Sequence, residues 1–207
     1  MTQFLQISDT HIVKPGNLVS GHLDTASPLK RVALRIAELQ FEVGQLDGIV
    51  VTGDVSDDGT ADSYALFKSI LEPLNLPIFC IPGNHDARAP FRNAFENAAY
   101  LPEKGKLNWK QKLGDLQLIG LDTLIEGQSG GELDRETLQF LKASLSDLRQ
   151  APAVILIHHQ PFKSGIAFMD TIGLQKGTEK LCAILGEYQG ELLILCGHVH
   201  RNISTRL

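Results

Sequence analysis

The sequence predicts an α/β fold, in which strands alternate with helices that pack on the faces of a sheet. The first observation behind this prediction is a set of six short, almost wholly apolar runs, as expected for strands buried on both faces. These runs cover residues 4–7, 48–52, 78–81, 116–121, 154–157 and 192–196. The second observation is that amphipathic helical patterns lie between several of the runs. With 207 residues, of which 43% are hydrophobic, we expect a single domain, residues 1–207, around a sizeable core.

Four helices are expected between these runs. Ser27 is the expected N-cap of the first helix because a proline follows it at the first helical position, and Gly44 is the expected stop. The second apolar stripe ends near Pro73. The third and fourth helices are expected to begin at Asp134 and Thr178, which are residue types that cap helix N-termini.

Composition excludes several classes of protein. The formal net charge of −5 leaves no broad basic surface for a nucleic-acid polymer. No uncharged apolar run approaches the ~20 residues of a membrane span, and residues 1–10 have no signal-peptide pattern. The three cysteines, Cys80, Cys182 and Cys196, lie in apolar runs and are expected to be reduced thiols. We therefore expect a cytoplasmic protein with no membrane partner.

Polar side chains follow five of the six predicted strands. The segments are Ser8-Asp9-Thr10-His11, Gly53-Asp54, Gly83-Asn84-His85-Asp86, His158-His159 and Gly197-His198-Val199-His200. In open α/β sheets the ligand crevice lies beyond the carboxyl ends of the strands, so these side chains are expected to converge. Imidazole, carboxylate and amide oxygen together suit borderline divalent metals such as Mn, Fe, Co or Zn. Six to eight such ligands exceed the needs of one ion, and two ions about 3.5–4 Å apart with a bridging carboxylate would use them.

Each of these motifs also has an ordinary structural interpretation. A Gly-Asp pair after a strand is commonly a turn, and Gly-Asn-His-Asp is compatible with a tight turn. The paired histidines are compatible with one core and one surface side chain. The joint interpretation as a metal site is favoured because all five segments occupy equivalent positions after strands.

Taken in order, these motifs resemble the signature of the calcineurin-like metallophosphoesterases, and they span residues 9 to 200. The loop around Phe168-Met169-Asp170 and the segment Gly130-Gly131-Glu132-Leu133 resemble the bacterial class III cyclic-nucleotide phosphodiesterase and glycerophosphodiesterase branch. The resemblance implies a four-layer α-β-β-α sandwich with two sheets. The chain ends seven residues after His200, where family members usually continue, so we expect it to lack C-terminal strands of the second sheet. Open sheet edges would favour a homodimer.

The resemblance also implies roles for individual residues. It places Asp9, His11 and His200 on one metal, Asn84, His158 and His198 on the other, and Asp54 as the bridge between them. It places His85 beside the phosphate, where it assists the leaving oxygen without binding metal. Asp57, Asp86 and His159 are expected to support the ligands through hydrogen bonds.

This set of residues suits hydrolysis of a phosphodiester. Two divalent ions would attract the anionic substrate and lower the pKa of a bridging water towards ~7, so that hydroxide attacks phosphorus. His85 would protonate the departing alkoxide. The expected function is hydrolysis of a small phosphodiester, either a cyclic nucleotide such as cAMP or a glycerophosphodiester.

Two stretches without a clear period, residues 13–26 and 160–177, are expected to be loops that rim the site. The candidate substrate contacts in them are His22, Phe162, Phe168 and Met169.

Three alternative functions share the predicted fold. A nucleotide-sugar pyrophosphatase of lipid biosynthesis would need an apolar lipid-binding insertion, which the sequence lacks. A DNA nuclease is disfavoured by the acidic charge. A non-catalytic binding scaffold is disfavoured because every motif position carries the residue expected of an enzyme.

Overall fold

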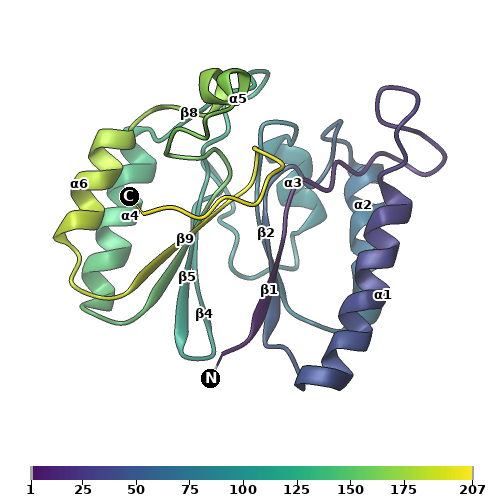
Figure 1. Cartoon of the computed structure of the whole chain (residues 1–207), viewed down its shortest axis with the longest axis horizontal. Coiled ribbons are helices and arrows are strands. Elements are labelled where there is room, and N and C mark those ends of the chain that lie inside the picture. The colour runs from purple at the N-terminus through teal and green to yellow at the C-terminus, as the bar shows by residue number, and fades with distance from the viewer. Residues whose placement is uncertain (1, 207) are drawn as a thin grey trace.

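The computed structural model describes residues 2–206, which form two principal sheets (Figure 1). The first sheet has three parallel strands in the order β1 (Phe4–Ile7), β2 (Gly48–Thr52) and β3 (Ile78–Ile81). The second has the order β4 (Trp109–Leu113), β5 (Leu116–Leu121), β7 (Ala153–Ile157) and β9 (Leu192–Cys196), with β4 antiparallel to β5 and the other pairs parallel. A small parallel pair joins β6 (Gly131–Glu132) to β8 (Leu174–Lys176). The predicted α/β class is therefore confirmed.

Helices flank the two sheets on opposite sides of the molecule (Figure 1). On the side of the first sheet lie α1 (Ala26–Val43) and α2 (Ala61–Leu71), the latter followed by the 3₁₀ turn η1 (Glu72–Leu74). On the side of the second sheet lie α4 (Arg135–Leu148) and α6 (Thr178–Glu187). Two short helices, α3 (Arg88–Ala94) and α5 (Ala167–Ile172), lie towards the end of the molecule to which the parallel strands point.

Strand β2 explains why the predicted strands read as continuous apolar runs. Alternate side chains of a strand point to opposite faces. Ile49 and Val51 pack into a cluster with the helices α1 and α2, whereas Val50 packs into a different cluster with residues of the second sheet, including Trp109 and Leu156. Each face of the sheet is thus buried, and every residue of β2 is buried. Burial of one such side chain contributes about 1.5–3 kcal/mol.

The structure corrects two of the predicted helix caps. Helix α1 begins at Ala26 rather than after Ser27, because the carboxylate of Asp24 already accepts the backbone N–H of Ser27 at 3.0 Å. Helix α6 begins at Thr178, but its N-cap is Gly177, whose φ of 96° suits glycine. The cap at Asp134 is confirmed, since its carboxylate accepts the N–H of Thr137 at 2.8 Å.

Six elements were not among the sequence predictions: β4, β6, β8, α3, α5 and the turn η1. Strand β4 reads Trp-Lys-Gln-Lys-Leu, which lacks a continuous apolar run because it lies at the edge of its sheet. Helix α3 has seven residues, too few for a clear helical period. Helix α5 and strand β8 lie within the stretch 160–177, which was expected to be an irregular loop. Among residues 2–206, no helix is both long and apolar enough to cross a membrane.

Candidate metal centre

The structure brings the predicted ligands together at the carboxyl ends of β1, β2, β3, β7 and β9. Four overlapping groups in the described chain have potential ligand atoms that all lie within 4.8 Å of one another. These groups are Asp9, His11 and His200; His11, Asp57 and His85; Asp9, Asp54 and His158; and His158, His159 and His198. Asn84 joins them, because its Oδ1 lies 3.1 Å from Nε2 of His158. Five strands of two different sheets therefore contribute to one cluster.

Backbone conformation at this cluster is unusual. Eight non-glycine residues in the described chain have a positive φ, a conformation that costs about 1–3 kcal/mol and tends to concentrate at functional sites. Five of the eight are candidate ligands: Asp9, His11, Asp54, His198 and His200. The residues with strained backbone therefore lie at the ends of the strands, among the candidate ligands.

Asp54 is the buried carboxylate at the centre of the cluster. Its side chain is 2% exposed, and its Oδ2 lies 3.3 Å from Nε2 of His158 and 3.6 Å from Nε2 of His11. Its Oδ1 accepts the backbone N–H of His85 at 2.9 Å. Burial opposes ionisation, but the neighbouring imidazoles outweigh it and lower the pKa of Asp54 well below its usual value. This carboxylate is therefore ionised and faces one histidine from each sheet.

The first group of ligands consists of Asp9, His11 and His200. Nε2 of His200 lies 3.3 Å from both Oδ1 of Asp9 and Nε2 of His11. His11 donates its Nδ1–H to Oδ1 of Asp57 at 3.0 Å, which leaves Nε2 as the lone-pair nitrogen that faces the cluster. A carboxylate that fixes the tautomer in this way is typical of metal-bound histidine.

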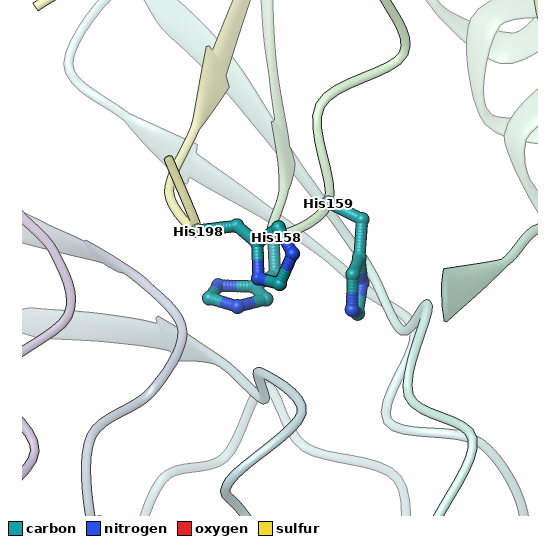
Figure 2. A group of neighbouring side chains, drawn as sticks. All are labelled: His158, His159 and His198. Atoms are coloured by element: carbon teal, nitrogen blue, oxygen red, sulfur yellow. The ribbon is translucent and has the colours of Figure 1, made fainter. Parts of the chain in front are cut away.

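His158 and His198 form the second group of ligands together with Asn84. His158 donates its Nδ1–H to the carbonyl of Thr52 at 2.8 Å, so its Nε2 faces Asn84 and Asp54. Figure 2 shows the rings of His158, His159 and His198 as neighbours, and the centroid of His198 lies 5.1 Å from that of His158 and 4.7 Å from that of His159. Nε2 of His198 is buried and has no hydrogen-bond partner, and burial lowers the pKa of this imidazole to about 4. A buried neutral nitrogen without a partner is costly unless a cation coordinates it, so the donor set fits a divalent metal.

His159 differs from the neighbouring histidines because both of its nitrogens are occupied. Nε2–H donates to the carbonyl of Ser129 at 3.2 Å, and Nδ1 accepts from the hydroxyl of Thr123 at 2.7 Å. Burial lowers the pKa of His159 well below its usual value, which keeps the ring neutral. His159 is thus bound within the protein rather than free to ligate. Sequence reasoning did not identify Thr123 and Ser129, because nothing in their local pattern marks them.

Asp57 and His85 lie beside the first group. Nδ1–H of His85 donates to the carbonyl of Asp57 at 3.1 Å and lies 3.3 Å from its Oδ1. The same Oδ1 accepts from His11, so one carboxylate orients two imidazoles. The side chain of His85 is 41% exposed, which makes it the accessible histidine of this pair.

Asp86 does not face the ligands but holds two loops together. Its buried carboxylate accepts backbone N–H groups of Gly83, Val55 and Ser56 at 2.9–3.1 Å, and the hydroxyl of Tyr64 at 3.0 Å. Burial and the charge of Asp54 raise the pKa of Asp86 to about 6. Its contacts are those of a residue that fixes the loop carrying Asn84 and His85.

The four predicted rim residues lie in different surroundings. Phe162 lines a cavity of about 1250 Å³ that Asp9 and His200 also line. Phe168 is 69% exposed, and the backbone carbonyl of Met169 accepts from Gln160 at 3.0 Å. His22 is exposed and donates its Nδ1–H to Ser20 within its own loop at 2.8 Å. Of the four, only Phe162 lines this cavity.

Comparisons with known proteins agree with this arrangement. A model of the calcineurin-like phosphoesterase family matches residues 2–202. The chain is 37% identical, over 98% of its length and 73% of the relative's, to a protein of Arcobacter nitrofigilis named probable glycerophosphodiester phosphodiesterase GpdQ. It is 32% identical, over 98% of its length and 71% of the relative's, to a protein of Pseudomonas aeruginosa named 3',5'-cyclic adenosine monophosphate phosphodiesterase CpdA.

A solved structure supports the same fold. The crystal structure of TT1561 of Thermus thermophilus superimposes with a TM-score of 0.57 over 95% of this chain and 81% of that protein, at 18% sequence identity. The chain therefore belongs to the calcineurin-like phosphoesterase family. It is a phosphoesterase with phosphodiesterase relatives along nearly its whole length.

Proposed function

We propose that this chain is a phosphodiesterase that depends on two divalent metal ions and hydrolyses small phosphodiesters. The observation that carries the proposal is the position of Asp54, a buried carboxylate with one imidazole at 3.3 Å and another at 3.6 Å. One ion would be held by Asp9, His11 and His200, the other by Asn84, His158 and His198, with Asp54 shared. Mn, Fe, Co and Zn suit this nitrogen and oxygen donor set.

The bound metals would supply Lewis acidity and a water molecule of lowered pKa that attacks phosphorus. The chain's own residues bind, orient and protonate. Asp57 holds Nδ1 of His85 as a donor, so the outer Nε2 is available to carry a proton to the leaving oxygen. Hydrogen bonds to the Thr52 carbonyl and to Asp57 fix the ring tautomers of His158 and His11, respectively. These two rings therefore need not reorient when a metal binds.

The proposed substrates are a cyclic nucleotide such as cAMP or a glycerophosphodiester. The names of the two relatives support this class of diester, one for each alternative. The fold proposed with this function is a four-layer α-β-β-α sandwich. Three hydrophobic clusters support that order, one under each pair of long helices and one between the sheets.

A substrate panel tests the proposal. The protein is stripped with a chelator, reloaded with Mn²⁺ or Co²⁺, and assayed with cyclic AMP, glycerophosphoethanolamine, and the mono- and bis-nitrophenyl phosphates. We expect diester hydrolysis that the chelator abolishes and the metal restores. Activity that survives exhaustive chelation, or metal binding with no hydrolysis of any diester, would contradict the proposal, and the second result would indicate a scaffold.

A further inference from the structure

Gln160 directly follows the histidine pair at the end of β7, and it binds the segment that carries α5. Its side chain is 2% exposed, and its Nε2 donates to the carbonyl of Met169 within α5 at 3.0 Å. Its backbone carbonyl accepts the N–H of Leu174, directly after that segment, at 3.3 Å. One residue next to a candidate ligand thus fastens α5 by both its side chain and its main chain.

Helix α5 has few other contacts outside its own loop: Nε2 of Gln175 donates to the carbonyl of Thr171 at 3.4 Å, and the N–H of Gly131 donates to the carbonyl of Gly173, directly after the helix, at 3.2 Å. The helix has six residues, Ala167–Ile172, none of which is buried, and so short a helix is not stable by itself. Its other side chains bind locally: Asp170 accepts from Ser164 and Gly165, and the hydroxyl of Thr171 donates to the carbonyl of Phe168. The Gln160 amide is therefore the contact that ties the middle of α5 to the end of β7.

The segment after α5 closely approaches the candidate metal centre. A Cβ at Gly173 would lie 2.6 Å from Nε2 of Gln160, so the chain passes directly over this amide. Gly131, whose N–H donates to the carbonyl of Gly173 at 3.2 Å, packs directly against the His159 ring, since a Cβ at Gly131 would clash with Nδ1 of His159. Gln160 also lines the cavity that contains His200.

The amide of Gln160 is held at a cost in stability. Its Oε1 is buried and has no hydrogen-bond partner, which costs free energy that an apolar side chain of the same shape would avoid. The contact that Gln160 does make is the one to α5. A buried amide with one unpaired atom and one specific hydrogen bond is typical of a residue that positions another element rather than stabilising the fold.

We propose that Gln160 is a positioning residue that holds α5 as a cap at the edge of the candidate metal centre, and that the cap selects the alcohol groups of the diester. The proposal rests on the proposed phosphodiesterase function. Figure 1 shows α5 at the end of the molecule where the parallel strands terminate, on the side of β8 and α6.

The test compares Gln160→Met with Gln117→Met. Gln160→Met keeps the length of the side chain but removes the amide, whereas Gln117→Met makes the same change at a partly buried glutamine near the start of β5, whose amide donates to the carbonyl of Leu118 at 3.4 Å, and serves as the matched control. In the Mn²⁺-loaded protein we expect Gln160→Met to raise KM for the preferred diester about fivefold, the effect of losing one hydrogen bond, with kcat and metal content nearly unchanged. Amide exchange over residues 166–173 is expected to accelerate by a similar factor. The control is expected to change neither KM nor exchange at Met169 and its neighbours.

Three results would overturn the proposal. The first is Gln160→Met with unaltered exchange over residues 166–173, which would show that the amide does not hold the cap. The second is a fall in kcat at constant KM, which would assign Gln160 to the chemical step. The third is an equal rise in KM for every diester, including bis-nitrophenyl phosphate, which would show that the cap does not discriminate between diesters. If the wild-type protein hydrolyses no diester, the proposed function and the selective role both fail, while hydrogen exchange still decides whether Gln160 holds α5.

Discussion

Two histidines at the candidate centre each have one ring nitrogen in a hydrogen bond, which leaves the other ring nitrogen free to bind a metal. His11 has Nδ1 bound by Asp57, and His158 has Nδ1 bound by the Thr52 carbonyl, so in each ring Nε2 faces the cluster. His159 lacks this arrangement because both of its nitrogens are bound. Residue type alone does not distinguish these histidines; their hydrogen-bond partners do.

Replacement of Asp54 by asparagine tests whether one carboxylate serves both halves of the site. Asp54→Asn keeps the shape of the side chain but removes the negative charge that faces His11 and His158. We expect the variant to lose metal from both positions, measured by elemental analysis after dialysis. The control is Asp57→Asn. The side chain of Asp57 contacts His11 and His85, so this variant is expected to retain the metal that His158 would hold. Full metal content in Asp54→Asn would refute the bridging role.

Replacement of His85 by alanine separates catalysis from metal binding. His85 is 41% exposed, its Nδ1–H donates to Asp57 rather than to a proposed metal ligand, and its ring packs edge to face on that of His11, with 4.7 Å between the centroids. We expect His85→Ala to keep its metal and to lose turnover by a factor of ~10²–10⁴, the usual contribution of a general acid. The loss is expected to be smaller for a nitrophenyl leaving group, which departs without a proton. Equal activity of variant and wild type on cyclic AMP would exclude this role.

At the scale of elements, the loop between β3 and α3 is fixed near the start of α3 by two anchors, Asp86 and Arg88. Asp86 binds it to the loop after β2. Arg88, at the start of α3, donates through Nε and Nη2 to the two oxygens of Asp122 at 2.7 and 2.9 Å, after the end of β5. Asp122 is fully buried, so this pair links the first sheet's loop to the second sheet. Asn84 and His85 directly precede the two anchors in sequence.

Arg88→Ala tests this link between elements. The substitution leaves the Asp122 carboxylate buried without its cation, and breaking a buried pair by removing one partner costs about 3–5 kcal/mol. We expect a decrease of that size in the free energy of unfolding by urea. The control is Arg35→Ala, which removes an exposed pairing with Glu38 and Glu42 and is expected to change the free energy of unfolding far less, because exposed ion pairs contribute little. Equal losses in the two variants would contradict the proposed anchoring.

At the scale of the whole molecule, the candidate site lies where the two sheets meet. Gln6 of β1 donates its Nε2–H to Thr52 of its own sheet at 3.0 Å and to the Cys196 carbonyl of β9 at 2.9 Å. The backbone N–H of His198 donates to the carboxylate of Asp9 at 2.9 Å. The ligands of each proposed ion come from both sheets, so a bound metal would join them.

Metal binding is therefore expected to stabilise the whole fold. A ligand that binds only the folded state stabilises it by about 2.7 kcal/mol at one hundred times its Kd. We expect Tm to rise progressively with Mn²⁺ concentration and to fall when a chelator is added, as measured by calorimetry. The same titration on Asp54→Asn is the control, and it is expected to show little change. A wild-type Tm that is insensitive to Mn²⁺ would argue against ligands that span the sheets.

Much of the fold could be predicted because the relevant signals are local. All six predicted strands are present, with β7 extended by one residue to Ala153, since strands covered on both faces must be apolar at every position. The edge strand β4 and the short helix α5 were missed because neither imposes a continuous pattern. Gln160 is adjacent to His159 in sequence, yet its role depends on Met169, and no local rule connects them.

Local sequence patterns were sufficient to predict the six apolar strands, the approximate positions of the four longer helices and the types of residue that follow each strand, because these depend on periodicity and on neighbours along the chain. The division of the strands into two sheets, the free nitrogen of each histidine and the attachment of α5 beside the site are set by tertiary contacts. These properties depend on contacts between residues up to 190 positions apart, such as Gln6 with Cys196. Pairing over such distances is set by the packing of the whole molecule, which a local sequence pattern does not encode.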